Sequence, residues 1–218
     1  SEEGWSYSEI NNAGVAATTA PYLLLLNNDC YLRNGCVQAM EKVLDEQENV
    51  GVVGAKLLFK QGLLQHIGVV FNHLGVPFHY GYGKPDDGTF APATRSDDYD
   101  AVTFACVLIR REAWDAVGGM DPAYFFNYED ADFCLMAKEK GWRVHMAADA
   151  VAVHDEGGST EHRRTENHSI QRNLDVFRKK WILNGRIEKV VFVRISRGAR
   201  DEAQDAIREA TALSDELD

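Results

Sequence analysis

The sequence Tyr22-Leu-Leu-Leu-Leu-Asn-Asn-Asp29 joins five consecutive apolar residues directly to three polar ones. A run that is apolar at every position is typical of a strand that helices cover on both faces. The polar residues then lie at the carboxyl end of the strand, where open α/β sheets bind their ligands. The stretch therefore predicts an α/β fold with a binding site beside Asp29.

Helical and extended patterns alternate on both sides of this strand. A helix capped by Ser6 or Ser8 and ended by Pro21 precedes it, and the apolar run Val50–Phe59 follows it. Alternation of this kind favours a mostly parallel sheet flanked by helices. The other predicted elements are a helix at Val37–Leu44, a strand at Ala101–Arg110, helices at Glu112–Val117 and Asp130–Gly141, two short strands within Arg143–His154 and a basic helix at Arg163–Trp181.

The length of 218 residues suits one domain with a short appendage. We expect the domain at residues 1–185 and the appendage at 186–218. The appendage would hold a strand at Lys189–Ile195 and an amphipathic helix at Ala199–Leu217. The chain enters its first helix without a preceding strand, which predicts part of a larger domain.

Composition excludes several classes of function. A formal net charge of -11 argues against nucleic acid as a partner, because binding to its phosphates needs clustered Lys and Arg. The run Tyr22–Leu26 is the longest apolar one and is far too short to span a bilayer. Four scattered cysteines with no secretory signal ahead of them predict a cytoplasmic setting.

Three polar clusters each follow or begin an apolar element: Asn27-Asn28-Asp29, Glu129-Asp130-x-Asp132 and His154-Asp155-Glu156. Carboxylate oxygens together with one imidazole suit Mg²⁺ or Mn²⁺. Each cluster also has a structural interpretation. The first is common turn chemistry, the second is stabilised by a helix dipole, and a histidine at a strand end is often bonded to backbone.

Ordered blocks along the chain resemble the catalytic domain of family 2 glycosyltransferases. Each block is weak alone, and their common order makes the resemblance specific over about residues 6–182. The blocks are Tyr7–Gly14, Tyr22–Asp29, Cys106–Trp114, Val117–Asp121, Phe125–Leu135 and Ala150–His154.

The resemblance implies the GT-A fold, with a Rossmann-type sheet, and transfer with inversion. It assigns Asp29 and His154 to a divalent metal, Mn²⁺ or Mg²⁺, and to the donor diphosphate. Asn27 replaces the first Asp of the family's Asp-x-Asp motif, so we expect modest metal affinity. Asp130 would be the general base, and Glu129 would orient the base or the acceptor.

The resemblance also implies the partners. The donor would be a nucleotide-diphosphate sugar, and the acceptor a glycan or a lipid-linked glycan. The family's strands that hold the nucleobase and ribose are expected before Ser1, so the first strands of the nucleotide-binding half are predicted to be missing. Contacts with the donor are implied at Asn12, Gly14, Asn27, Asn28, Asp29, Gly118 and Gly119.

Gln171-Arg-Asn-Leu and Arg178-Lys-Lys-Trp181 do not reproduce the Gln-x-x-Arg-Trp motif of processive synthases. We therefore expect an enzyme that adds one or a few sugars in cell-surface polysaccharide or glycan synthesis. The same basic run predicts a peripheral contact with the inner membrane face or with a lipid-linked acceptor, and a solvated helix face is the alternative.

Two other functions remain open from the residues. The same carboxylates could serve a metal-dependent phosphoester hydrolase or nucleotidyltransferase. A degenerate sugar-nucleotide-binding or assembly module without turnover is the non-enzymatic alternative.

Overall fold

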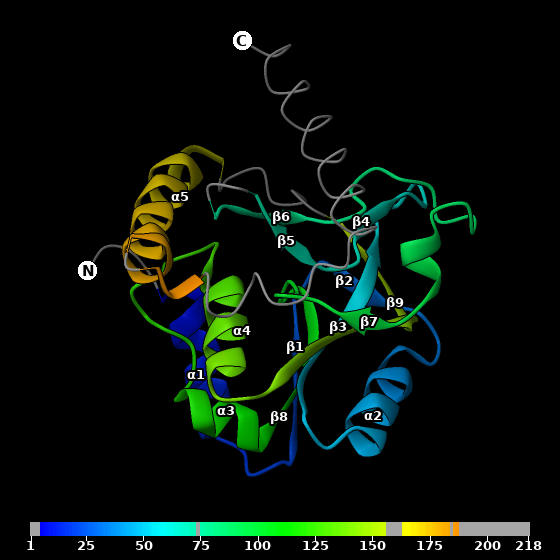
Figure 1. Cartoon of the computed structure of the whole chain (residues 1–218), viewed down its shortest axis with the longest axis horizontal. Coiled ribbons are helices and arrows are strands. Elements are labelled where there is room, and N and C mark those ends of the chain that lie inside the picture. The colour runs from blue at the N-terminus through cyan, green and yellow to red at the C-terminus, as the bar shows by residue number, and fades with distance from the viewer. Residues whose placement is uncertain (1–4, 73–74, 156–162, 184, 188–218) are drawn as a thin grey trace.

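A mixed β-sheet carries helices on both of its faces (Figure 1). The computed structural model describes residues 5–72, 75–155, 163–183 and 185–187, with side chains left out at 163–169. The helices are α1 (Tyr7–Ala16), α2 (Cys36–Glu46), α3 (Arg111–Val117), α4 (Glu129–Glu139) and α5 (Arg163–Phe177), with a 3-10 turn η1 (Ala91–Thr94) and a π-helical turn η2 (Arg178–Ile182). The strands are β1 (Tyr22–Leu26), β2 (Cys30–Leu32), β3 (Val50–Leu58), β4 (Leu64–His66), β5 (Val69–Phe71), β6 (Pro77–His79), β7 (Asp97–Asp98), β8 (Cys106–Arg110) and β9 (Arg143–His154).

The main sheet has the strand order β1-β8-β3-β9-β2, while β5 and β6 form a separate hairpin. Strands β1 and β3 both pair antiparallel with β8, and β3 pairs parallel with β9. Thus β1, β3 and β9 run in one direction, as the alternation predicts. Strand β8 lies between β1 and β3 and runs in the opposite direction. Among the described residues only the β3–β9 pairing is parallel, so the expectation of a mostly parallel sheet is wrong. An apolar run indicates that a strand is buried on both faces of the sheet. A strand such as β8 is buried in this way whether it runs parallel or antiparallel to its neighbours, so the run does not predict its direction.

Two predicted helix boundaries agree with the structure, and one predicted break between strands does not. Ser6 caps α1 in a capping box with Glu9, and Gly118 ends α3 with a φ of 90°. The two strand pieces predicted within Arg143–His154 form one strand, β9, whose register with β3 shifts after Ala147. The predicted strand and helix beyond residue 188 lie outside the described residues.

Successive residues of the central strands supply two separate cores. On β3, Val52 packs in the cluster that contains Trp114 of α3, whereas Val53 packs in the cluster that contains Met40 of α2. Figure 1 shows α2 on one side of the sheet and α3 and α4 on the other. Burial on both faces is the reason why β3 is apolar at nearly every position, since strand side chains alternate between faces.

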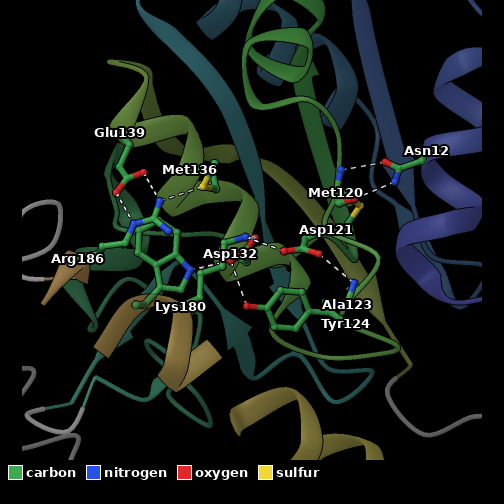
Figure 2. A network of polar contacts seen from close by, with 11 residues as sticks. Asn12, Met120, Asp121, Ala123, Tyr124, Asp132, Met136, Glu139, Lys180 and Arg186 are labelled. Carbon is green, nitrogen blue, oxygen red and sulfur yellow. Dashed lines mark hydrogen bonds and ion pairs between the residues drawn. The ribbon is translucent and has the colours of Figure 1, made fainter. Parts of the chain in front are cut away.

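The π-helical turn η2 is anchored on α4 by a network of polar contacts (Figure 2). Lys180 Nζ lies 2.9 Å from Asp132 Oδ2 and 2.8 Å from Asp121 Oδ2. Trp181 Nε1 donates to Asp132 Oδ1 at 2.7 Å, and the Tyr124 hydroxyl donates to the same oxygen at 3.1 Å. The Asp132 carboxylate thus accepts hydrogen bonds from three donors. Two residues of the predicted basic run, Lys180 and Trp181, therefore face the domain interior.

Within the described residues, no helix is both long enough and apolar enough to cross a bilayer. Of the basic run, Lys179 is exposed and Arg178 is half-buried. The run therefore does not present one continuous basic face.

Replacement of Asp132 by Ala should lower the free energy of unfolding by about 3 kcal/mol, because the buried indole N–H of Trp181 loses its acceptor and the half-buried Lys180 ammonium keeps only Asp121. Urea unfolding checks this value. Glu46→Ala, which removes an exposed i,i+4 ion pair, is the control and should change stability by less than about 0.5 kcal/mol. Equal effects of the two variants would show that Asp132 does not anchor η2.

Candidate functional site

Backbone pairing between β2 and β9 brings Asp29 to His154. Cys30, the first residue of β2, is the register partner of His154, and the Asp155 N–H donates to the Asp29 carbonyl at 3.0 Å. The Asp29 Oδ1 atom then lies 3.2 Å from His154 Nε2. The turn Asn27–Asp29 follows β1, and Asn27 Nδ2 lies 3.5 Å from the same ring nitrogen. The structure therefore brings together the two residues that the resemblance assigns to the metal.

The hydrogen bonds of His154 define its proton position. Its Nδ1 lies 2.9 Å from Oε1 of the buried Gln65, so the ring proton on Nδ1 is donated to that oxygen. The Nε2 lone pair of a neutral ring then faces Asn27, whose amide donates to it, and the Asp29 carboxylate. A lone pair and a carboxylate oxygen at this distance repel each other unless a proton or a cation lies between them.

The pair fits a divalent cation in its donor set. One carboxylate oxygen and one imidazole nitrogen suit Mn²⁺ or Mg²⁺, and Gln65 gives His154 the outer partner typical of metal-bound histidines. No group of three or more His, Cys, Asp or Glu side chains in the described part of the chain could hold a metal ion. Two protein ligands would leave the other coordination positions to phosphate oxygens and water, as is usual for Mg²⁺.

The acidic end of the site lies at the start of α4. Burial raises the pKa of Asp130, and the Ala131 N–H, which donates to Asp130 Oδ1 at 2.7 Å, opposes that rise. The charge of His79, the Thr103 side chain and the Phe104 N–H act in the same sense as Ala131. Asp130 is half-buried, so part of its side chain is open to a solute.

Glu129, the residue before Asp130, is a buried acid. Its side chain is 5% exposed, and its Oε2 has no hydrogen-bond partner among the described residues. Burial, and secondly the charge of Asp130, raise the pKa of Glu129 to about 8. Glu129 is thus protonated at neutral pH, and the adjacent pair carries at most one negative charge.

A strained turn aims these two acids. Asn127 and Tyr128, which precede Glu129, both have a φ of 73°, a conformation that costs a residue with a side chain about 1 kcal/mol or more. Asn173 of α5 holds the turn, because its buried amide donates to the carbonyls of Phe126 and of Asn127, the latter at 3.2 Å. Sequence reasoning missed Asn173, since nothing in its neighbourhood indicates a contact so distant along the chain.

Two adjacent residues of β4 each bond a second polar side chain, Gln65 that of His154 and His66 that of His79 on β6. Next to Gln65, the buried His66 places its Nδ1 at 2.8 Å from Nδ1 of His79 on β6. The backbone N–H of Thr103 donates to His66 Nε2 at 3.2 Å. No sequence pattern predicts these contacts, because β4 and β6 each span only three residues.

The glycines and Asn12, for which donor contacts are implied, lie elsewhere in the fold. The Asn12 amide bonds the backbone of Met120 in both directions, at 2.8 and 2.9 Å (Figure 2). A Cβ at Gly119 would lie 2.8 Å from Asn12 Oδ1, so this position requires glycine. Gly14 lies on α1, Gly118 ends α3, and the exposed Asn28 lies in the turn after β1. Contact of these residues with a donor stays a prediction.

Residues 2–175 match the family described as glycosyltransferase like family 2, and the chain belongs to that family. It is 32% identical over 182 residues to the uncharacterized protein y4gI of Sinorhizobium fredii, covering 81% of this chain and 20% of that protein. It is 30% identical over 160 residues to the O-antigen biosynthesis protein RfbC of Myxococcus xanthus, covering 71% and 12%. The chain thus spans about a fifth or less of the length of these two relatives.

Two solved structures share the fold. GalNAc-T7 with UDP, GalNAc and Mn²⁺ gives a TM-score of 0.55 at 11% identity, covering 72% of this chain and 32% of that one. The mannosyltransferase PcManGT of Pyrobaculum calidifontis, in complex with GDP-Man and Mn²⁺, gives 0.52 at 14% identity, covering 81% and 45%. The expectation of an α/β fold of the GT-A type is confirmed.

Glu129 should make the stability of the protein depend on pH. Its folded-state pKa of about 8 exceeds the ordinary value of 4.5, so its contribution is full below pH 4.5 and is lost as the pH rises toward 8. Glu129→Gln stays neutral, so its free energy of unfolding should fall less over this range and exceed that of the parent at pH 8 by on the order of 1–3 kcal/mol. Urea unfolding at several pH values measures this, and parallel curves would contradict it. Replacement of the exposed Glu48 by Gln is the matched control.

Proposed function

We propose that this chain transfers a sugar from a nucleotide-diphosphate sugar to an acceptor hydroxyl with inversion at the anomeric carbon. The observation that carries the proposal is the Asp29–His154 pair, a carboxylate oxygen and an imidazole nitrogen 3.2 Å apart, together with the half-buried acid Asp130 at the start of α4. Membership of the glycosyltransferase family supports it.

The Asp29–His154 pair would receive the donor diphosphate. A divalent cation bound there supplies a Lewis acid that stabilises the negative charge left on the diphosphate. Gln65 keeps the His154 ring in the orientation and tautomer that a ligand needs. Support for this class of donor comes from the two structures of the same fold, whose names include UDP or GDP-Man together with Mn²⁺.

Asp130 would act on the acceptor. As the hydroxyl oxygen forms its bond to the anomeric carbon, Asp130 takes the hydroxyl proton, and the electrons of the breaking glycosyl–phosphate bond go to the diphosphate. One displacement of this kind inverts the anomeric centre. The start of α4 favours the ionised carboxylate, and protonated Glu129 adds no competing charge beside it.

The product is proposed to be a cell-surface polysaccharide or related glycan, with a glycan or lipid-linked glycan as acceptor and one or a few sugars added. The relative RfbC, described as an O-antigen biosynthesis protein, supports this class of product.

Binding of Mn²⁺ should depend on both members of the metal pair. Asp29→Asn and His154→Gln should each weaken Mn²⁺ binding more than about ten-fold, since loss of outer partners alone has effects of this size. Calorimetric titration with Mn²⁺, in the presence of UDP and separately of GDP, measures the affinity. Asp45→Asn, an exposed carboxylate on α2, should bind as the parent does. Parental affinity in both site variants would remove the metal from the proposal.

Asp130→Asn separates catalysis from binding. The variant keeps the shape of the side chain but cannot accept a proton, so we expect donor affinity within a few-fold and a transfer rate lowered on the order of 10²-fold or more. The measurement is nucleoside diphosphate release from a panel of UDP- and GDP-sugars with glycan acceptors. The control is Glu112→Gln, an exposed carboxylate in the first turn of α3. Equal rates for both variants would reduce Asp130 to a helix-dipole partner.

A further inference from the structure

The side-chain amide of Asn173, on α5, bonds the backbone of three consecutive residues that lead into α4. Its Oδ1 accepts the N–H of Phe125 at 3.4 Å, and its Nδ2 donates to the carbonyls of Phe126 and of Asn127, the latter at 3.2 Å. Asn173 is fully buried, so bulk water does not compete for these bonds. The segment ahead of α4 is therefore held by a residue of α5.

The partners of Asn173 fit a carboxamide and not the residues closest to it in size. Both N–H groups of the amide and one lone pair of its oxygen are used. An Asp would place a carboxylate against two carbonyl oxygens, and a Ser hydroxyl offers one proton for two acceptors. A buried carbonyl that loses its donor costs about 1–3 kcal/mol. The position therefore requires two donors at once, which is a demand of the turn rather than of the packing of α5.

The turn that Asn173 holds is unfavourable by itself. Asn127 and Tyr128 both have a φ of 73°, and a side chain in this left-handed conformation costs about 1–2 kcal/mol. The Tyr128 ring packs against Phe177, which lies one turn after Asn173 on α5, with the ring centroids 5.7 Å apart. Two residues of α5 thus fix the backbone and a side chain of the same turn.

This turn determines where the first turn of α4 lies. The Asp132 N–H donates to the Tyr128 carbonyl at 2.9 Å, so the helix begins from the left-handed conformation. Later residues of α4 have their own support, since Phe133 and Leu135 are almost fully buried in the core. A relaxed turn would therefore displace Asp130 without unfolding the helix.

We propose that Asn173 is a positioning residue for Asp130, which places that carboxylate for the transfer step by holding the left-handed turn ahead of α4. This inference rests on the proposed function, because Asp130 is the base of that reaction. The bonds of Asn173 go to residues 125–127, whereas Asp29 and His154 are brought together by the pairing of β2 with β9. A change at Asn173 should thus slow transfer and leave donor binding as it is.

The first test is kinetic. Asn173→Leu keeps the size of the side chain and removes its hydrogen bonds, so kcat should fall on the order of ten-fold, with KM for the donor within about two-fold, because a misplaced group loses rate rather than binding. Nucleoside diphosphate release from the UDP- and GDP-sugar panel with glycan acceptors measures both. The control is Gln171→Leu, an exposed amide on the same helix, which should keep the parental kcat.

A second-site glycine distinguishes positioning from general stability. Glycine adopts a positive φ without a side-chain cost, so Tyr128→Gly added to Asn173→Leu should bring kcat back to within about three-fold of the parent. A loss caused by poorer packing of α5 would instead grow, because the glycine also removes the contact between Tyr128 and Phe177. If Asn173→Leu alone does not fold, the same glycine should restore folding.

Amide hydrogen exchange measures the turn without any substrate. In Asn173→Leu, exchange of the Asp132 N–H, which bonds the Tyr128 carbonyl, should accelerate about ten-fold more than exchange of the Leu135 N–H in the middle of α4. Equal acceleration at the two amides would show that Asn173 does not act through the turn.

The outcomes separate this inference from the function beneath it. The role of Asn173 would be overturned, and the base left intact, by parental kcat in Asn173→Leu while Asp130→Asn is inactive, or by a failure of Tyr128→Gly to restore rate or folding. Parental transfer by Asp130→Asn would overturn the proposed function itself.

Discussion

The antiparallel pairing of Cys30 with His154 is the constraint on which the candidate site depends. β1 and β9 run in the same direction, and the short β2 turns back beside the end of β9. Asp29 lies inside that turn, so backbone hydrogen bonds fix its position without the help of its side chain. A site built from strand pairing in this way needs few side-chain torsions to be fixed, which favours a preorganised geometry.

The acidic end depends on a different support. The left-handed turn at Asn127 and Tyr128 is unfavourable alone, and Asn173 of α5 supplies the hydrogen bonds that hold it. The adjoining η2 is anchored through Trp181 and Lys180 on Asp132, in the same helix that the turn begins. The helix α5 and the turn η2 therefore support the turn and the helix that carry Glu129 and Asp130, although no residue of η2 is assigned to the proposed chemistry.

Burial and periodicity account for what the sequence could predict. The apolar run Tyr22–Leu26 is β1, and the helix expected between Asp130 and Gly141 is α4. Burial and periodicity do not predict strand direction, because a run that is buried on both faces has the same pattern in either direction. The reversed direction of β8 was therefore not predicted. The proximity of Asp29 and His154 came from the family resemblance. The His66–His79 pair came from neither, since two histidines 13 positions apart carry no pattern.

Helix geometry explains why one acidic run in the sequence has three separate roles in the structure. At 100° per residue, Asp130 and Asp132 project from nearly opposite sides of α4. Asp132 therefore bonds Lys180 of η2, and Asp130 interacts with the Thr103 side chain, while Glu129 is buried between them. Lys180 pairs with Asp132 and burial keeps Glu129 protonated, so the three acids of this one run differ in their partners and in their exposure to solvent.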